Sequence, residues 1–441
     1  MKNRVLILGA GLVTKPVITY LLDRNYQVTI ASRTVSKADC IVTGYKNATT
    51  KQLDAIQDEA GLAREVEAHD IVVSLLPAVH HLIVAKQCIA KQKPLVTTSY
   101  VSPAMQELDS KVKELGLIFL NECGLDPGID HMSAMKTIHE VENAGGKIVS
   151  FCSYCGGLPS LRNNNNPFGY KFSWSPRGVV LAGKNSARFM KNKQIIDIPG
   201  EELFEHYEFI DIPGFGTFEG YPNRNSLGYI EKYNLKDVRT MFRGTLRNVG
   251  HCETWRNIAK LGILNDEKKY DFSVMPPATL IALLIGQKEV SDLKKAVAEY
   301  LKISPYSVFL HKIEWLGLLS RQLVPLKDAT ALDLFVYLLQ SKLQYAEKET
   351  DLVILQHEFL AEYPDRKEKI ISTLIDEGIQ DGDTAMARTV SWPAAIAVKM
   401  ILNDQISLKG VQIPVHPEIY EPILQELQEL KISLKEKKIL L

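Results

Sequence analysis

Residues 1–16 read MKNRVLILGAGLVTKP, and this stretch decides the fold. Val5–Leu8 is a short unbroken apolar run, typical of a β-strand that is buried on both faces. Gly9–Gly11 then predicts a sharp turn, and Val13–Leu22 resumes the apolar pattern at helical spacing. A strand, a glycine turn and a helix bring free N–H groups and the positive end of a helix dipole to one point, where a diphosphate can bind. The stretch therefore predicts a dinucleotide-binding domain.

Two nearby features qualify this prediction. The fingerprint G-x-G-x-x-G/A has a small residue at its sixth position, where this chain has Thr14, so we expect looser packing between strand and helix. The next strand, Gln27–Ala31, ends at Ser32-Arg33-Thr34 without the acidic residue that holds the ribose hydroxyls of NAD. A guanidinium with neighbouring hydroxyls suits a 2′-phosphate, so NADP(H) is the predicted cofactor. The alternative is that Arg33 is only a solvated strand end.

The composition predicts a soluble protein of more than one domain. A chain of 441 residues is long for one core, so two or three domains are expected. Lys+Arg and Asp+Glu balance at 52 each, which gives no net charge to attract nucleic acid or an anionic membrane. No apolar run approaches the roughly 20 residues of a membrane span. Six cysteines do not suggest a disulfide scaffold. We therefore expect a cytoplasmic enzyme or ligand-binding protein with no nucleic-acid or membrane partner.

Strands alternate with helices over the first 120 residues or so. Further buried strands are predicted at 70–77, 94–100 and 117–120, with helices at 78–91 and 103–115. This alternation predicts a parallel, doubly wound α/β sheet. Ligands of such sheets bind outside the carboxyl ends of the strands. The turns expected to meet there are 9–12, 32–34, 74–77, 97–100 and 121–128.

The pattern changes from residue 146 onward. Period-two alternation at 147–155, 170–175, 205–211 and 236–247 predicts a second domain on a mixed or antiparallel sheet. Residues 251–342 are expected to form an all-helical insertion, and 352–355 returns to strand character. Thr384–Leu402 is predicted to be one apolar helix that Pro393 kinks or splits. The last thirty residues, rich in Glu, Lys and Leu, predict a solvated amphipathic helix and tail.

Polar side chains at two predicted strand ends are candidates for chemistry. Thr97–Tyr100 places hydroxyls and a phenol where they could donate to a carboxylate or orient a nicotinamide carboxamide. Asp126 lies in a turn with Pro127 and Gly128, and could pair with a substrate ammonium or move a proton. The alternatives are ordinary strand-end hydroxyls in the first case and helix capping by Asp126 or Asp130 in the second.

Cysteines and arginines of the second domain are further candidates. Cys152 and Cys155 form a C-x-x-C pair on a predicted strand, where positions three apart point to opposite faces. No second ligand pair follows, so we expect no metal site, and a single functional thiol at Cys155 is favoured. Three arginines next to turn residues, Arg224, Arg243 and Arg247, could clamp a carboxylate. The alternative for any one of these arginines is a surface ion pair, which contributes little.

A series of rigid blocks goes beyond composition and spacing. The blocks are VTTSYVSPAM (96–105), NECGLDPGIDH (121–131), SYCGGLP (153–159), NPFGYKFSWSPRGV (166–179), YPNR (221–224), RGTLR (243–247), WLGLL (315–319), DLVILQHEF (351–359) and MARTVSWPAAIAVKMIL (386–402). In this order, over essentially the whole chain, they resemble the saccharopine reductases, the NADP-dependent, glutamate-forming saccharopine dehydrogenases of the aminoadipate lysine pathway.

The resemblance implies an architecture and a reaction. It implies a variant Rossmann domain (1–130 and about 385–441), a mixed α/β substrate domain (131–250 and about 343–384) and an all-helical inserted domain (251–342). It also implies that the amine of L-glutamate condenses with the aldehyde of 2-aminoadipate 6-semialdehyde, and that hydride from NADPH reduces the imine to saccharopine. The physiological direction stays open, and a homodimer is possible.

The resemblance also implies roles for individual residues. The cofactor-contacting positions are Gly9, Gly11, Leu12, Val13, Ser32, Arg33, Thr34, Asp54, Leu75, Thr98, Leu125, Asp126, Pro127 and Trp174. The substrate-contacting positions are Ser99, Tyr100, Asp126, Arg224, Thr245, Leu246 and Arg247. Asp126, Tyr100 and Cys155 are the candidates for proton transfer during imine formation. The segment 36–52 matches the family poorly, so Asp54 depends on the weakest part of the resemblance.

Two other functions are considered. A carboxyspermidine-type dehydrogenase also reduces an imine, but it would have acidic residues where Arg224 and Arg247 stand. A catalytically silent relative would bind NADP and would have lost these arginines. Both arginines are present, which favours the saccharopine-forming enzyme.

Overall fold

The computed structural model describes residues 3–288 and 290–441, which divide into two compact units. Unit 1 comprises Met1–Val149, Lys232–Asp237 and Leu355–Leu441, and unit 2 comprises Ser150–Glu231 and Val238–Ile354. Unit 2 includes both the expected substrate sheet and the expected helical insertion. The division into three domains stays a prediction.

Unit 1 is built on a seven-stranded sheet in the order β17-β6-β5-β4-β1-β2-β3. Every neighbouring pair of these strands is parallel. The strand order reverses direction at β1, as in a doubly wound sheet, so the predicted fold class is confirmed. The strands are β1 (Arg4–Leu8), β2 (Gln27–Ser32), β3 (Ala48–Gln52), β4 (Ile71–Ser74), β5 (Leu95–Thr97), β6 (Ile118–Leu120) and β17 (Gly410–Gln412).

Two of these strands have no counterpart in the sequence prediction. β3 has the sequence ATTKQ, which is polar because the strand lies at one edge of the sheet. β17 has only three residues and joins the opposite edge from a segment about 290 residues further along the chain than β6. Neither strand has the apolar run by which a buried parallel strand is recognised.

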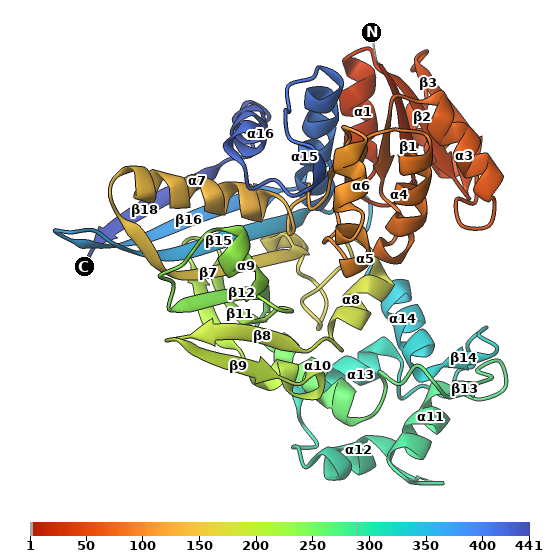
Figure 1. Ribbon diagram of the computed structural model, residues 1–441. Helices are drawn as coiled ribbons and strands as arrows, with labels where there is room; N and C mark the ends of the chain where they lie inside the picture. The colour runs from red at the N-terminus through yellow and green to blue at the C-terminus, as the bar shows by residue number, and fades with distance from the viewer. Residues whose placement is uncertain (1–2, 289) are drawn as a thin grey trace. The chain divides into compact units, whose positions relative to one another are not determined.

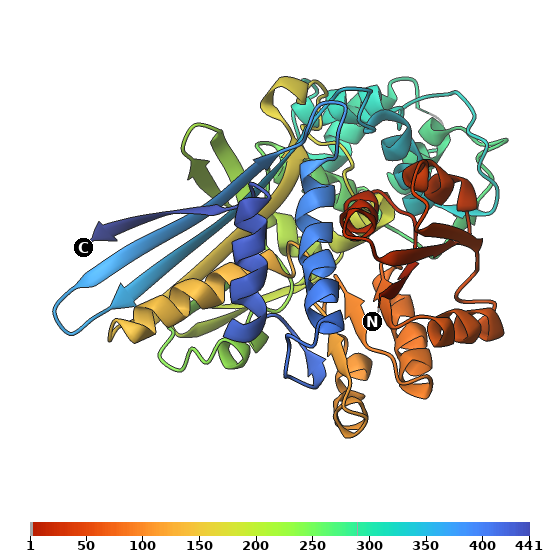
Figure 2. The ribbon, with the colours of Figure 1, turned by 90° about the horizontal axis from the view of Figure 1, so that it is seen from above.

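Helices cover both faces of this sheet. Leu6 and Leu8 pack with apolar side chains of α3 and α4, so the alternate residues Val5 and Ile7 face the other side, where α1 packs against α15 (Figures 1 and 2). The helices of unit 1 are α1 (Lys15–Asp23), α2 (Val35–Val42), α3 (Glu59–Ala68), η1 (Ala78–His80), α4 (His81–Ala90), α5 (Pro103–Gln106), α6 (Asp109–Glu114), α7 (Ile129–Asn143), α15 (Ala385–Leu402) and α16 (Pro417–Glu429).

Helix α15 belongs to the core of unit 1. The helix runs without interruption through Pro393, so the expectation that proline might split it is wrong. Its length and apolar composition would suit a membrane span, but 78% of the helix is buried inside the protein. The Ser391 hydroxyl of α15 donates a hydrogen bond to the carbonyl of Val13. The late apolar helix thus supports the glycine turn at the beginning of the chain.

The end of the chain differs from the prediction. The amphipathic helix is α16, but the expected tail is the strand β18 (Leu434–Leu440), which pairs antiparallel with β16 (Lys367–Glu377). The sequence LKEKKIL resembles a solvated tail because β18 is an edge strand, and charged side chains protect such an edge from further pairing.

Unit 2 contains a mixed sheet, as predicted. β7 (Lys147–Pro159) and β15 (Asp351–Glu362) each carry the chain across the boundary between the units. In unit 2, β7 pairs parallel with β12 (Thr240–Asn248), and antiparallel strands continue through β11 (Gly216–Pro222) to β10 (Glu208–Ile212). β8 (Ala187–Lys191) pairs with β12 and with β9 (Gln194–Ile198). The shorter helices are η2 (Leu161–Asn163), α8 (Pro176–Ala182), η3 (Gly200–Glu205) and α9 (Gly228–Lys232).

The predicted strand at 170–175 is wrong. This segment is irregular and leads into α8, whose first turn contains Pro176 and whose N-cap is Ser175. Its alternating residues are buried because Tyr170 and Phe172 insert into an apolar cluster, and not because the backbone is extended in a sheet.

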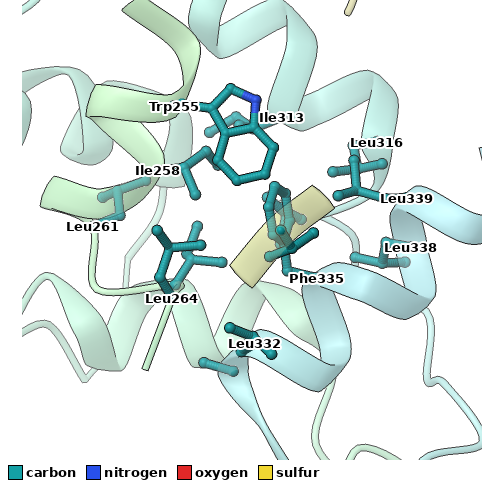
Figure 3. Packing of buried hydrophobic residues seen from close by; sticks show 14 of the residues in the cluster. Trp255, Ile258, Leu261, Leu264, Ile313, Leu316, Leu332, Phe335, Leu338 and Leu339 are labelled. Carbon is teal, nitrogen blue, oxygen red and sulfur yellow. The ribbon is translucent and has the colours of Figure 1, made fainter. Parts of the chain in front are cut away.

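The described residues of the segment 251–342, which are 251–288 and 290–342, contain helices and one short strand pair. The helices are α10 (His251–Lys260), α11 (Pro277–Leu284), α12 (Leu293–Leu301), α13 (Val308–Leu316) and α14 (Ala331–Lys342), and the strands are β13 (Lys269–Tyr270) and β14 (Ala329–Thr330). Side chains of α10, α13 and α14 interdigitate in a core around Trp255 and Phe335 (Figure 3). The two rings are 5.7 Å apart in a T-shaped arrangement.

Phe335→Ala should destabilise the protein by about 3–5 kcal/mol, because it removes a fully buried ring and leaves a cavity. Urea unfolding followed by circular dichroism measures the change. The matched control is Tyr306→Ala, since Tyr306 is 94% exposed and should change the free energy of unfolding by less than about 0.5 kcal/mol. Equal effects of the two substitutions would contradict the described core.

Candidate functional site

The glycine turn presents unpaired backbone donors. Gly9 has a φ of +109°, and an added Cβ would lie 3.1 Å from the carbonyl oxygen of Leu75, so a side chain is disfavoured on both grounds. Thr14 is buried, and its hydroxyl accepts a hydrogen bond from the N–H of Gly11 at 2.9 Å. Across residues 3–288 and 290–441, the N–H groups of Leu12 and Val13 have no acceptor. With the amino terminus of α1, these donors suit a diphosphate.

Thr14 thus has a role that its mismatch with the fingerprint does not predict. Its side chain fills the junction of turn and helix and ties the loop together by the hydrogen bond to Gly11. The expected looseness at this position is therefore not observed.

The end of β2 carries the predicted 2′-phosphate residues. Arg33 and Thr34 are exposed, and Ser32 is partly buried. Arg33 makes no ion pair within the described part of the chain, so its guanidinium has no competing anion there. Asp54, in the turn after β3, accepts hydrogen bonds from the N–H groups of Ile56 and Gln57 at 3.0 and 3.2 Å. The Asp54 carboxylate therefore stabilises its own turn, which lies beside Ser32 because Leu53 N–H donates to the Ser32 carbonyl.

The ends of β5 and β6 bring two predicted catalytic residues together. The hydroxyl of Tyr100 donates to the carboxylate of Asp126 at 2.7 Å. The N–H groups of Glu122 and Cys123 donate to the carbonyls of Ser99 and Thr97, each at 3.1 Å, so the two turns run side by side. The other residues predicted here are the half-buried Leu75 and Thr98 and the buried Leu125 and Pro127.

Glu122, His131 and Tyr233 form a buried hydrogen-bond network that the sequence did not predict. Glu122 accepts from the N–H of Val101 at 3.0 Å, and its second oxygen lies 2.7 Å from Nε2 of His131. Nδ1 of His131 lies 2.5 Å from the hydroxyl of Tyr233, and Lys232 Nζ lies 3.5 Å from Glu122. Burial raises the pKa of Glu122, but the hydrogen bond and charge of His131, with the charge of Lys232, outweigh burial and bring the pKa down to about 2.

The carboxylate of Asp130 lies next to this network, 3.5 Å from Nδ1 of His131, and is occupied by contacts within the protein. Asp130 is buried in the first turn of α7, and its carboxylate accepts at 2.5 Å from the N–H of Gly128, which is the N-cap of the helix. His131 follows Asp130 directly in the NECGLDPGIDH block, but its place in the sequence predicts no role for it. Tyr233 could not be predicted either, because it lies more than a hundred residues further on, in a six-residue segment that packs in unit 1.

A second missed group lies at the end of β4. Nδ1 of His81 is 2.8 Å from the hydroxyl of Ser74, and Nε2 is 2.9 Å from the hydroxyl of Ser99. Burial, with a smaller contribution from the positive charge of His80, lowers the pKa of His81 to about 4. His81 is therefore neutral at physiological pH.

In unit 2, one face of the sheet carries two of the four predicted substrate residues. Thr245 and Arg247 are two apart on β12 and share a face. Thr245 lies directly beside Cys155 of β7 and Tyr221 of β11. Cys152 is paired with Phe242 and so belongs to the opposite face, which agrees with the prediction that the two cysteines are not a ligand pair. Among the described residues, no cluster of three potential metal ligands is found.

Arg247 is a buried cation without a carboxylate partner in the described chain. The residue is 7% exposed, its Nη1 donates to the Leu246 carbonyl at 2.8 Å, and its Nε has no partner. The guanidinium lies 5.0 Å from the centre of the Tyr170 ring. Glu219, directly opposite on β11, is already bound by the N–H groups of Gly250 and Cys252 at 2.8 and 2.7 Å. A buried guanidinium in this state suits an incoming carboxylate.

The electrostatic effect of Arg247 is visible at His251. Burial, followed by the positive charges of Arg247 and Lys312, lowers the pKa of His251 well below its usual range. His251 therefore stays neutral and does not compete with Arg247 for an anion.

The remaining predicted residues of unit 2 differ in exposure. Arg224 is exposed two residues after the end of β11, Trp174 is half-buried, and Leu246 is fully buried. The side chain of Leu246 faces away from Thr245 and Arg247, because neighbouring residues of a strand point to opposite faces. On the face that carries Thr245 and Arg247, Leu246 can therefore present only its backbone.

Comparison with known proteins gives consistent matches. Residues 5–120 match the family described as the saccharopine dehydrogenase NADP binding domain, and residues 124–432 match the saccharopine dehydrogenase C-terminal domain. The chain is 40% identical to "Saccharopine dehydrogenase [NADP(+), L-glutamate-forming]" of Pyricularia oryzae over 98% of both chains. It is 39% identical to the protein of that name from Saccharomyces cerevisiae over the whole of both chains.

A solved structure is also similar over the whole chain. It is the apo, histidine-tagged saccharopine dehydrogenase (L-Glu forming) of Saccharomyces cerevisiae, which is 38% identical. The TM-score is 0.89, with 99% of this chain and all of that chain covered.

Acidification should destabilise the protein through His81. The folded-state pKa is about 4 and the unfolded value is 6.5, so the unfolded chain binds more protons between these values, and the free energy of unfolding falls as pH falls. One such group contributes up to about 1.4 kcal/mol per pH unit, or roughly 2 kcal/mol between pH 6.5 and 4.5. Urea unfolding at both pH values measures this loss.

The control for this prediction compares adjacent histidines. His81→Gln removes the titrating group and should reduce the loss by about 2 kcal/mol. His80→Gln, at a half-buried neighbour without a side-chain hydrogen bond in the described chain, should reduce the loss only slightly, because the charge of His80 is the smaller of the two causes. If both variants lose as much stability as the parent, His81 is not the responsible group.

Proposed function

Because the chain belongs to the saccharopine dehydrogenase family, we infer that it is the NADP-dependent, L-glutamate-forming enzyme, an oxidoreductase acting on CH–NH donors. The reaction interconverts saccharopine with L-glutamate and 2-aminoadipate 6-semialdehyde in the aminoadipate lysine pathway. The alternatives, a silent NADP-binding relative and a carboxyspermidine-type dehydrogenase, are not favoured, since the full-length relatives are named as saccharopine dehydrogenases.

The residues of unit 1 fit NADP(H). The free N–H groups of Leu12 and Val13 would receive the diphosphate, and the unpaired Arg33 would receive the 2′-phosphate. When bound, NADPH supplies the hydride that reduces the imine. The protein's own task is to hold the imine carbon close to the cofactor and to exclude water.

The observation that carries the substrate assignment is the buried, carboxylate-free Arg247. Saccharopine has three carboxylates and a secondary amine. Arg247, with Thr245 on the same face, offers cationic and hydroxyl donors for these carboxylates. Arg224, which follows the end of β11 that pairs with Gly244, offers a second cation. A diamine substrate would be repelled by the same arginine.

Proton transfers in imine formation need an acid–base group. The hydrogen bond between Tyr100 and Asp126 supports these two residues, because it lets a proton pass between phenol and carboxylate at the strand ends. Cys155 is a third candidate because it lies beside Thr245. We propose that the Tyr100–Asp126 pair serves the carbinolamine and imine steps and that Asp126 pairs with the substrate amine.

We propose the location from the composition and from the free cysteines, whereas the composition does not address the assembly. Six cysteines that are all reduced agree with a cytoplasmic enzyme, and the balanced charge gives no reason for nucleic-acid or membrane binding. A homodimer is proposed as the assembly. Size-exclusion chromatography with light scattering would overturn it if the mass were that of one chain.

Saccharopine should drive reduction of NADP by the purified protein, followed as the absorbance of the reduced nicotinamide. Activity with NAD should be much lower. Arg33→Ala should raise KM for NADP about 10- to 100-fold with little effect on KM for NAD, because only NADP has the 2′-phosphate. Lys37→Ala, which removes the same charge at an exposed site on α2, is the matched control. The absence of saccharopine-dependent reduction with either cofactor would refute the proposed function.

Arg247→Leu should raise KM for saccharopine at least 30-fold while the Kd for NADP stays unchanged, since a buried charge-assisted hydrogen bond is lost. Arg247→Lys should recover only part of the loss, because an ammonium cannot bind a carboxylate in the bidentate manner. The control is Arg321→Leu, the same change at an exposed arginine of unit 2. A KM that stays the same in Arg247→Leu would exclude this arginine as a substrate ligand.

A further inference from the structure

A chain of three side chains links the interior of unit 1 to a predicted substrate residue. Ser74 is the last residue of β4 and is fully buried, His81 is the first residue of α4 and is 5% exposed, and Ser99 is half-buried in the turn after β5. The two hydrogen bonds of His81, to Ser74 at 2.8 Å and Ser99 at 2.9 Å, use both ring nitrogens. No role in binding or catalysis has been assigned above to His81 or Ser74.

The direction of these hydrogen bonds follows from Ser74. Within the described chain, the Ser74 hydroxyl has no partner besides Nδ1 of His81. If Nδ1 carried the proton, the buried Ser74 proton would have no acceptor, which is the more costly state for a hydroxyl. Ser74 therefore donates to Nδ1, and the proton of the neutral imidazole lies on Nε2 and is donated to Ser99 Oγ.

The same reasoning fixes the role of the Ser99 hydroxyl. Because its oxygen accepts from His81, its own proton is left for a further acceptor, and the described chain provides none. Hydrogen bonds in such a chain also polarise one another, which strengthens the terminal donor. A hydroxyl held in this state is complementary to an oxyanion and is poorly suited to accept from an ammonium.

We propose that His81 is a positioning residue that fixes the Ser99 hydroxyl as a hydrogen-bond donor to a carboxylate of the substrate. This inference rests on the proposed function, which supplies a substrate with three carboxylates. His81 neither touches the substrate nor moves a proton in the reaction. Its neutral state is maintained by burial, so the pH profile of the reaction should not contain a His81 ionisation.

The test is a double-mutant cycle on His81 and Ser99 with saccharopine-dependent NADP reduction as the assay. His81→Leu should raise KM for saccharopine about tenfold, with kcat within twofold and KM for NADP unchanged. Ser99→Ala should raise KM similarly. The double variant should be no worse than either single one, because His81 acts only through Ser99.

Three further variants separate positioning from packing. His81→Gln keeps an N–H donor that can reach Ser99 and should recover most of the KM, whereas His80→Leu should leave every constant unchanged. Ser74→Ala removes only one buried oxygen and should raise KM about two- to threefold, because both tautomers of His81 then become accessible. Ser74→Ala therefore tests the proposal even if His81→Leu does not fold.

Several results would overturn the proposal. Additive effects of His81→Leu and Ser99→Ala would show that His81 acts elsewhere. A raised KM for NADP with an unchanged KM for saccharopine would assign the Ser99 donor to the cofactor. An unchanged KM in both His81→Leu and Ser74→Ala would also contradict it. Failure of the proposed function is distinguishable, since the parent protein itself would then give no saccharopine-dependent signal.

Discussion

The constraint on which unit 1 depends is that parallel strands end at the same edge of their sheet. The turns after β1, β2, β4, β5 and β6 are brought together by this topology alone. The Glu122–His131 interaction then fixes the last of these turns, because the buried carboxylate accepts from Val101 N–H on one side and contacts imidazole on the other. Without this carboxylate, the buried N–H of Val101 and one nitrogen of His131 would lose their partners.

The two units differ in the kind of hydrogen-bond donor that they offer to a ligand. In unit 1 the donors toward the cofactor are backbone N–H groups, hydroxyls and one exposed guanidinium, and they are arranged by secondary structure. In unit 2 the principal donor is a buried side chain, Arg247, whose cost of burial is offset only when a carboxylate arrives. Among the described residues the opposing Glu219 makes no ion pair with Arg247, and its carboxylate accepts hydrogen bonds from the N–H groups of Gly250 and Cys252.

The sequence was sufficient for the parallel sheet and the cofactor class, and it named Tyr100 and Asp126, which the structure joins by a hydrogen bond. Apolar runs identified β1, β2, β4, β5 and β6, and Arg33 without a neighbouring acid indicated NADP. It was not sufficient for β3, β17 and β18, because short or charged edge strands lack the apolar pattern of buried ones. The prediction of a strand at 170–175 was wrong, because an irregular segment that buries every second side chain shows the same alternation of apolar and polar residues as a strand. The sequence could not predict a pair such as His131–Tyr233, because this contact depends on where a segment about a hundred residues away packs.

In this chain, the residues that define the fold and the cofactor class are different from those proposed to select the substrate, as the glycine turn and the buried arginine illustrate. A turn of Gly9–Gly11 type recognises a diphosphate, which many dinucleotide-dependent enzymes share, so it selects a cofactor class and no reaction. The residues proposed to restrict the substrate are cations and oriented hydroxyls, and in the proposal the hydrogen-bonding state of each is fixed before the substrate binds. Arg247 has no carboxylate partner among the described residues, which leaves its guanidinium available to the substrate. In the proposed arrangement the hydroxyl of Ser99 accepts a hydrogen bond from neutral His81, and the buried Ser74 determines which ring nitrogen of His81 carries the proton. Specificity for a tricarboxylate therefore depends as much on the buried groups behind the site as on the donors that face it.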